Sequence, residues 1–299
     1  MKKRPILVSV SIVSLLVVTA IILGSAGVFA QGIDADTIVA TDFIQSTDVV
    51  VGTPVESAAA LLPSKVGVTV KKDGVLNSEI LHTAVFEKSQ WMVHGGSAAV
   101  FENGKLSVKQ QSDIFRAVTG GTYEDFVIET TLKGTSTSID NNFGVMFRAS
   151  NITDKGPDSY QGYYVGIGKN GGSSALVIGY GNNGWNFIDQ KNINYEANRD
   201  YALKIVMYGK ILAVFLDGEL LYKNELSLFE SGRVGVRTYR QLFECSSFTV
   251  RTPSTEDLAA AGIVSTEKTE ATLEGWSSPD YDGTKMGSFT FKSKIKGTE

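Results

Sequence analysis

The sequence predicts an all-β protein whose main domain is an antiparallel jelly-roll β-sandwich. Short segments in which apolar and polar residues alternate recur at roughly regular spacing, which is typical of strands with one buried face. Turn-forming Gly, Asn and Asp residues separate these segments, and no convincing amphipathic helix lies among them. At least eight strands are expected, at residues 126–132, 143–148, 163–167, 176–180, 201–207, 211–216, 233–238 and 248–251. Such a series favours a sandwich or jelly roll over a helical fold.

Residues 1–30 have the features of a secretory signal peptide. Three cations at positions 2–4 precede an apolar run over residues 6–23, and Val28 and Ala30 supply the small residues that a cleavage site needs. An apolar run of this length also fits an uncleaved membrane anchor. With either reading we expect the rest of the chain outside the cytoplasm, secreted or at the cell surface.

The composition argues against a nucleic-acid partner. The 299-residue chain has a formal charge of −4, which becomes −7 when the three cations of the signal segment are removed. No basic cluster lies outside the N-terminus, so an anionic polymer finds no complementary surface. We therefore expect no nucleic-acid binding, and membrane contact only through an uncleaved N-terminal segment.

Cys245 is the single cysteine, which excludes an intrachain disulfide. It shares strand parity with Phe243, so we expect it to be a small buried hydrophobe. A catalytic thiol would need a histidine beside it, and His82 and His94 lie in a different part of the chain.

Residues 31–85 are expected to form a β-rich N-terminal extension. Short strand candidates are 38–39, 49–51 and 66–70, and residues 57–62 have the pattern of one helical turn closed by Pro63. Two readings stay open for this part: an edge of the main domain or a small separate module.

After the main domain, residues 253–275 have the composition of a linker. Beyond it, residues 289–298 align without gaps on residues 126–135, with Phe, Lys, Gly and Thr identical. We therefore expect residues 276–299 to begin a second, truncated copy of the sandwich, in which Trp276 corresponds to Trp91. The alternative is a coincidence between two amphipathic strands.

Three of the expected strands have an unusual second face. Their apolar residues alternate with Gly, Arg and Tyr, as in Tyr163 to Gly168. If the strands share a sheet, its outer side is a shallow floor that carries Arg148, Tyr164, Arg237 and Tyr239. A glycine inside a strand often marks close approach to the backbone. The alternative is that the glycines only relieve strain in a twisted sheet.

These motifs resemble a known family. They are Trp91, a Gly-Val-x-Phe-Arg strand at 144–148, a Gly-Tyr strand at 162–163, a Leu-Asp-Gly hairpin at 216–218 and a closing Gly-x-Val-Gly strand at 232–235. Residues 86–252 resemble a concanavalin A-like lectin/glucanase module, most closely the levanase-type fructan-binding, keto-disaccharide hydrolase-like and LamG-like sandwiches that accompany glycoside hydrolases. The resemblance implies glycan recognition on a sheet face or its loops, often with calcium holding a loop.

The resemblance and the strand parity together give candidate site residues. Sugars present CH faces that lie on aromatic rings and hydroxyl groups that pair with planar polar groups. The expected glycan contacts are Arg148, Tyr164, Arg237 and Tyr239 on the floor, with Asn183 and Trp185 at the rim. The expected calcium ligands are Asp140, Asn142, Asp154 and Asp158. Trp185 as core filler and the acidic residues as solvated turns are the competing readings.

The sequence gives little support for catalysis. Glucan-cleaving relatives carry paired carboxylates on one strand face, but Glu124 and Glu129 differ by five positions and face opposite ways. We therefore expect an exported, non-catalytic, lectin-like module that binds a poly- or oligosaccharide. Two alternatives stay open: a glycan-active hydrolase of the keto-disaccharide type, and a cell-surface adhesion protein in which the sandwich is structural.

Overall fold

The computed structural model describes residues 7–8, 38–42, 44, 47–72, 74–95, 99–109, 115–136, 141–155, 158–285, 289–293 and 295. The chain divides into two compact units, one of residues Val75–Ile263 and one that joins Met1–Gly74 to Val264–Glu299. The expected signal peptide, apart from Leu7 and Val8, lies outside the described residues. Within the described ranges, no helix has both the length and the apolar character needed to cross a membrane.

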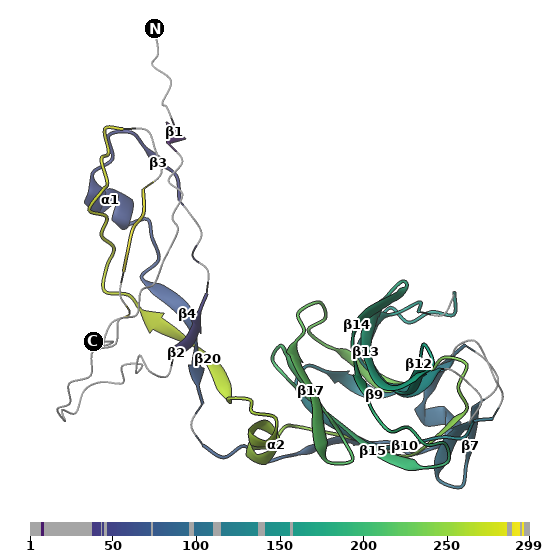
Figure 1. Cartoon of the computed structure of the whole chain (residues 1–299). Helices are drawn as coiled ribbons and strands as arrows, with labels where there is room; N and C mark the ends of the chain where they lie inside the picture. The colour runs from purple at the N-terminus through teal and green to yellow at the C-terminus, as the bar shows by residue number, and fades with distance from the viewer. Residues whose placement is uncertain are drawn as a thin grey trace. The chain divides into compact units, whose positions relative to one another are not determined.

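The larger unit is the expected antiparallel β-sandwich, which confirms the predicted fold class (Figure 1). The seven-stranded sheet has the order β14-β13-β12-β11-β18-β9-β6. Its strands are β6 (Met92–His94), β9 (Phe115–Tyr123), β11 (Asn142–Ser150), β12 (Gln161–Asn170), β13 (Ser173–Asn182), β14 (Trp185–Asn192) and β18 (Gly232–Thr238).

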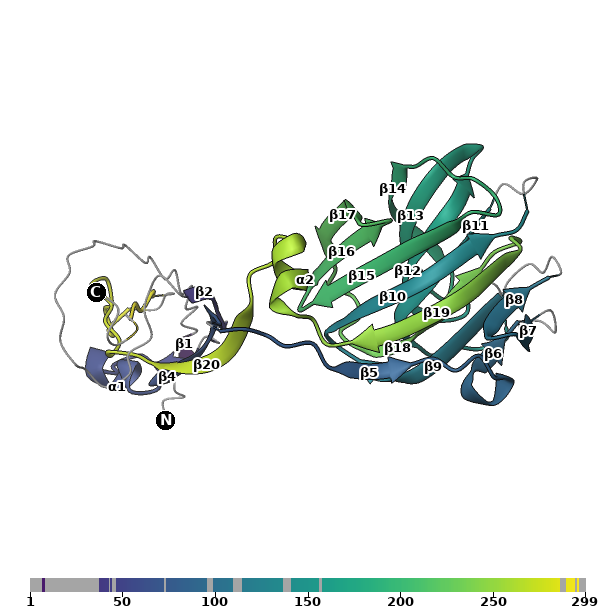
Figure 2. The same ribbon diagram turned by 90° about the horizontal axis from the view of Figure 1, so that it is seen from below.

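The eight-stranded sheet has the order β17-β16-β15-β10-β19-β8-β7, with β5 also paired to β19 (Figure 2). Its strands are β5 (Ile80–Thr83), β7 (Ala99–Glu102), β8 (Lys105–Val108), β10 (Phe126–Gly134), β15 (Asp200–Tyr208), β16 (Ile211–Leu216), β17 (Glu219–Glu225) and β19 (Phe243–Arg251). Every expected strand is therefore present, and the Asn103–Gly104 turn between β7 and β8 has the positive φ angles typical of a tight hairpin.

One apolar core fills the space between the two sheets. The rings of Phe143 and Phe243 stack across it at 5.8 Å, and Trp91 lies edge-on to Phe248 at 5.9 Å. Cys245 is fully buried in this core, as predicted, and burial raises the pKa of its thiol to about 12. The inner faces of both sheets are thus committed to stability, and only their outer faces and loops are open to a ligand.

The smaller unit joins segments from the two ends of the chain. Strands β2 (Ile38–Thr41), β4 (Lys65–Lys71) and β20 (Thr266–Thr272) form one sheet in the order β2-β4-β20. Strand β1 (Leu7–Val8) pairs with β3 (Val49–Val50), and helix α1 (Val55–Ala59) ends before Pro63.

The boundary between the two units lies inside the segment that we expected to be a linker, residues 253–275. The expected linker contains helix α2 (Thr255–Ala260), which belongs to the larger unit, and β20, which belongs to the smaller unit. Strand β20 has a polar sequence because most of its side chains are exposed, with Ala271 buried. The described residues after it also lie in the smaller unit, where Phe291 is buried and the Trp276 indole donates a 2.8 Å hydrogen bond to Pro63 O.

Candidate functional site

The outer face of the seven-stranded sheet carries aromatic rings that lie against glycines. A Cβ atom at Gly166 would lie 2.4 Å from Tyr164 Oη, and one at Gly179 would lie 2.4 Å from the Trp185 ring. A Cβ atom at Gly181 would lie 2.7 Å from the ring of Tyr160. The glycines of this face therefore allow close approach, as the sequence indicated, and the groups that approach are the protein's own aromatic rings.

Arg237 on β18 is the centre of this aromatic surface. Its guanidinium carbon lies 4.6 Å from the centroid of the Tyr164 ring and 5.3 Å from that of Trp185. Tyr164 is fully buried, its hydroxyl donates to Asn142 Oδ1 at 2.8 Å, and burial raises its pKa above the ordinary value. Arg237 is itself only 4% exposed, so it contributes one edge of its side chain to the surface.

Asp158 neutralises Arg237. Its Oδ1 accepts hydrogen bonds from Arg237 Nη2 at 2.6 Å and from Nε at 3.1 Å. Asp158 belongs to the segment between β11 and β12, so the ion pair holds this segment to the outer face of the sheet. A second arginine of the same face, Arg116 on β9, donates to Thr153 O at 2.8 Å and holds the segment at another point.

A cavity of about 340 Å³ opens beside this cluster. Its size is in the range of small-ligand sites. Trp185 is 39% exposed at its rim, and the other lining residues carry amides, an ammonium group, a phenol ring, the Arg237–Asp158 pair and the apolar side chain of Val177. The lining residues are Asn141, Asn142, Asp158, Lys169, Asn170, Val177, Trp185, Arg237 and Tyr239.

The structure brings several of the predicted site residues together. Trp185, Arg237 and Tyr239 line the cavity, and Tyr164 lies beneath Arg237 and Trp185. Trp185 packs edge-on to Tyr164 at 5.8 Å while it stays partly exposed, so it does not fill the core. Asn183 lies at the exposed turn between β13 and β14 and does not line the cavity.

The placement of Arg148 on the same floor was wrong. Arg148 has a φ of 47° at a break in the β11 register, and a bulge of this kind turns a side chain away from its expected face. Its guanidinium is 2% exposed and donates to three backbone carbonyls, those of Glu124, Gly209 and Phe229, at 2.7 to 3.1 Å. Arg148 therefore joins loops of the sandwich and does not line the cavity.

The expected calcium ligands do not form a metal site in the described part of the chain. Asp158 pairs with Arg237, and Asp154 Oδ1 lies 3.2 Å from His94 Nδ1 and accepts from Gly95 N at 3.0 Å. Asn142 lines the cavity, and Asp140 lies outside the described residues. No group of three or more His, Cys, Asp or Glu residues that suits a metal occurs among the residues that the structure describes. The donor set present there does not fit calcium.

Four lining residues were not expected from the sequence: Asn141, Lys169, Asn170 and Val177. Lys169 and Asn170 end β12 just before a Gly-Gly turn, a signal that predicts only a hairpin. Lys169 N donates to Asn141 O at 3.0 Å, and Asn170 Nδ2 donates to Gln190 Oε1 at 2.6 Å. These contacts join β12 to the residue before β11 and, across β13, to β14, so alternation within a single strand could not reveal them.

Comparisons with known proteins give one matching family and several similar solved structures. Residues 82–238 match the family described as the 3-keto-alpha-glucoside-1,2-lyase-like domain. The carbohydrate-binding module CBM66 from Bacillus subtilis has 16% identity and a TM-score of 0.48, over 55% of this chain and 96% of that one. A Bacillus subtilis protein of unknown function with a galectin-like fold has 14% identity and a TM-score of 0.47, over 60% of this chain and 97% of that one.

The carbohydrate recognition domain of Emp46p, in a mutant form, has 11% identity and a TM-score of 0.48, over 58% of this chain and 98% of that one. None of the curated proteins matches the sequence.

Proposed function

Because the chain belongs to the family of 3-keto-alpha-glucoside-1,2-lyase-like domains, we propose that its sandwich binds a carbohydrate in the cavity beside Arg237. In this proposal the protein is exported and its ligand is an extracellular poly- or oligosaccharide. The binding role does not require a bound metal.

The observation that carries the proposal is the combination of an exposed ring with fixed polar groups around one cavity. Trp185 presents an aromatic face at the rim, suited to the CH face of a sugar ring. The amides of Asn142 and Asn170 and the ammonium group of Lys169 are suited to sugar hydroxyls. Since Asp158 already neutralises Arg237, this arginine offers little charge to an anionic ligand.

The aromatic rim extends beyond the cavity and favours a chain of sugars over a single one. Phe187 is 54% exposed on β14 and pairs with Gly179, the glycine under the Trp185 ring. Residues two positions apart on a strand lie about 6.7 Å apart on one face. Trp185 and Phe187 therefore offer two neighbouring surfaces on which successive sugar rings can lie.

A second candidate function is lyase or hydrolase activity on a 3-keto-glucoside, which the family name favours. Elimination or hydrolysis needs a free general base or acid close to the sugar. The carboxylate of the lining, Asp158, is committed to two hydrogen bonds from Arg237. Because this carboxylate is committed, the geometry favours binding over catalysis; Lys169 and Tyr239 are the other lining side chains that can exchange a proton.

The binding proposal is tested on a glycan array with and without EDTA, followed by affinity measurements on the glycans retained. Trp185→Ala is expected to weaken binding by about 10-fold or more, in the range of an interface hot spot. Leu228→Ala, which truncates a side chain that is 60% exposed elsewhere on the sandwich, is the matched control and should change nothing. Equal affinities of Trp185→Ala and the wild type would refute the cavity as the site.

Two further measurements separate the alternatives. On incubation with a 3-keto disaccharide we expect no turnover, whether or not the sugar binds. If product does form, and if Asp158→Asn or Tyr239→Phe abolishes its formation, the protein is an enzyme. N-terminal sequencing of the exported protein should begin at Gln31 if residues 1–30 are cleaved, and an intact N-terminus in the membrane fraction would establish the anchor.

A further inference from the structure

A second depression, of about 450 Å³, lies on the outer face of the eight-stranded sheet. It belongs wholly to the larger unit and is separate from the cavity beside Arg237, since the two are on different sheets. Its floor comes from the central strands β15, β10 and β19, and Ala260 of helix α2 lines one side. Its volume lies in the range of small-ligand sites.

Small side chains in register make the depression. Ala202 on β15 pairs with Thr131 on β10, and Thr131 pairs with Ser247 on β19. In the adjacent row, Glu129 pairs with Lys204 on one side and with Thr249 on the other. The floor is therefore a row of Ala, Thr and Ser next to a row with longer side chains, and this difference in height forms a groove across the strands.

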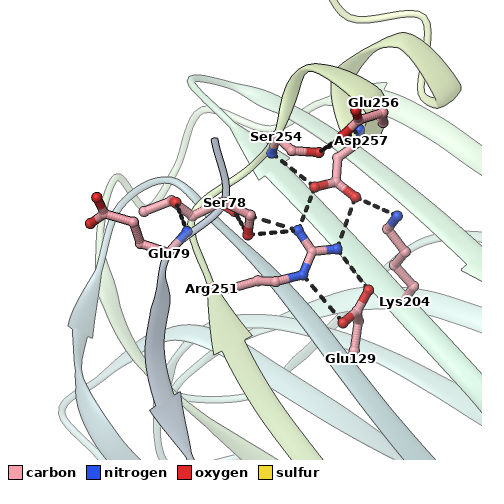
Figure 3. A network of polar contacts seen from close by, with 9 residues as sticks. Ser78, Glu79, Glu129, Lys204, Arg251, Ser254, Glu256 and Asp257 are labelled. Carbon is pink, nitrogen blue, oxygen red and sulfur yellow. Dashed lines mark hydrogen bonds and ion pairs between the residues drawn. The ribbon is translucent and has the colours of Figure 1, made fainter. Parts of the chain in front are cut away.

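The charges around the groove compensate one another (Figure 3). Arg251 Nη2 and Nε donate to the two carboxylate oxygens of Glu129 at 2.7 and 3.2 Å. Arg251 also pairs with Asp257 of α2, and Lys204 Nζ lies 2.5 Å from the same carboxylate. Two cations and two anions thus form one closed network, so the groove offers no net charge to a charged ligand.

The same network fixes α2 as the wall of the groove. Ser254 and Asp257 form a reciprocal capping box at the start of the helix, and Leu258 is buried in an apolar cluster with Phe215. The wall is consequently part of the folded sandwich and is already formed before a ligand binds.

Hydroxyl groups on the floor are directed by the strands. Ser247 Oγ accepts from Thr131 N and donates to Thr131 Oγ1, both at 2.9 Å, which leaves the Thr131 hydroxyl proton for another acceptor. The Thr249 hydroxyl forms no hydrogen bond with any residue that the structure describes. The Glu129 side chain is 46% exposed and retains acceptor capacity beside them.

We propose that this groove is a second ligand site, specific for an uncharged, hydroxyl-rich chain such as a segment of a neutral glycan. Paired charges exclude a polyanion or polycation, and a floor of hydroxyls and small side chains complements a narrow polyol chain. One sandwich would then hold two stretches of glycan, one on each outer face, which raises the avidity for a polysaccharide.

The test uses affinity electrophoresis of the full exported chain in gels that contain levan, dextran or laminarin as neutral probes. Two groove variants are compared with two matched controls. Ala202→Arg covers the floor at an exposed position, and Ala259→Arg makes the same change on α2 outside the groove. Thr249→Val removes one hydroxyl, and Thr122→Val does the same at an exposed position of β9.

In the Trp185→Ala background, which disables the first cavity, Ala202→Arg is expected to weaken the remaining retardation by about 10-fold and Thr249→Val by about 3-fold. The controls should match Trp185→Ala alone. If Trp185→Ala by itself abolishes all retardation, the groove proposal fails while the first cavity stands. If Ala202→Arg in the wild-type background abolishes all retardation, the first cavity is refuted as a glycan site and the groove is supported.

Polygalacturonate serves as the anionic probe. If polygalacturonate retards the wild type, and Thr249→Val weakens this retardation while Thr122→Val does not, the assignment to a neutral ligand is overturned. If none of the neutral polymers retards the wild-type protein, the groove is not a glycan site.

Discussion

Arg237 and Asp158 form an ion pair in which both side chains are nearly buried, 5% and 10% exposed, with Nη2 and Oδ1 2.6 Å apart. The pair connects β18 to the segment between β11 and β12 and also forms part of the cavity lining. The geometry of the candidate site therefore depends on a contact that also stabilises the fold.

Asp158→Ala should leave a buried guanidinium without its counter-ion. We expect the free energy of unfolding to fall by about 3–5 kcal/mol, because an uncompensated buried charge costs far more than an exposed pair contributes. Urea unfolding, followed by tryptophan fluorescence, measures this loss of stability. Asp154→Ala, whose side chain is 70% exposed, is the control and should cost less than about 1 kcal/mol. Equal losses for the two variants would contradict the assignment.

Arg148→Met should act on stability and not on glycan binding. The variant removes the hydrogen bonds from the buried guanidinium to the carbonyls of Glu124, Gly209 and Phe229, and hydrogen bonds of a charged group contribute about 1.5–3 kcal/mol each. We expect unfolding at a urea concentration well below that of the wild type, with the affinity of the folded protein unchanged. Arg233→Met removes one longer contact, 3.4 Å to Gly120 O, and should cost less. If Arg148→Met lowered the glycan affinity without lowering the stability, Arg148 would belong to the binding surface after all.

The contrast between Arg148 and Arg237 shows where sequence reasoning on this sheet ends. Alternation placed Arg237 correctly because β18 stays in register around it, from Val234 to Thr238. It failed at Arg148 because one residue with a positive φ reverses the parity of the residues after it, so that Ala149 shares the outer face with Met146. Nothing in the residue types near Arg148 signals a bulge.

The glycines of the outer face were predicted, but their partners were not. The pattern of residues 163–168 shows that Gly166 leaves space above the sheet, and it does not show which ring enters; Gly179, under the ring of Trp185, was not part of the pattern. Tyr164 and Trp185 enter because Arg237 holds both rings by cation–π contacts, a tertiary relation between β12, β14 and β18. The fold class and strand positions therefore followed from local pattern, whereas the cavity followed from contacts between strands.

Gly166→Ala should strain this packing. The new Cβ would lie 2.4 Å from Tyr164 Oη, and Tyr164 has little freedom to move because it is fully buried and bonded to Asn142. Overpacking of this kind costs about 1–3 kcal/mol, which thermal unfolding measures. Gly184→Ala is the control, since a Cβ there meets no atom within 4 Å. Equal melting temperatures for the two variants would show that Tyr164 can leave its position freely.

The ends of the chain were the least predictable part. The polar strand β20 resembles a linker because its pairing with β4 buries few of its side chains. Its partner lies about 200 residues earlier, from Lys65 to Lys71, and no local pattern connects strands across that separation.

The pH dependence of stability should report on Asp257. Burial alone would raise its pKa, but hydrogen bonds from Arg251, Lys204 and Ser254 N outweigh burial and hold the pKa well below the ordinary value. A carboxylate whose pKa is lowered on folding contributes stability that is complete above its unfolded pKa of about 3.9, and this contribution is lost as the pH falls below it. Wild-type stability should therefore decline from about pH 4 downward.

Asp257→Asn isolates this contribution. At pH 7 the variant should be less stable than the wild type by about 3 kcal/mol, because Arg251 and Lys204 lose a buried partner. The difference should shrink as the pH is lowered from 4 toward 2, because Asp257 takes up a proton in the unfolded wild-type chain while it stays ionised in the folded one. Urea unfolding at a series of pH values measures both curves, with Glu219→Gln as an exposed-carboxylate control that tracks the wild type. Curves for Asp257→Asn and the wild type that stay parallel down to pH 2 would show that the network around α2 does not depend on the charge of Asp257.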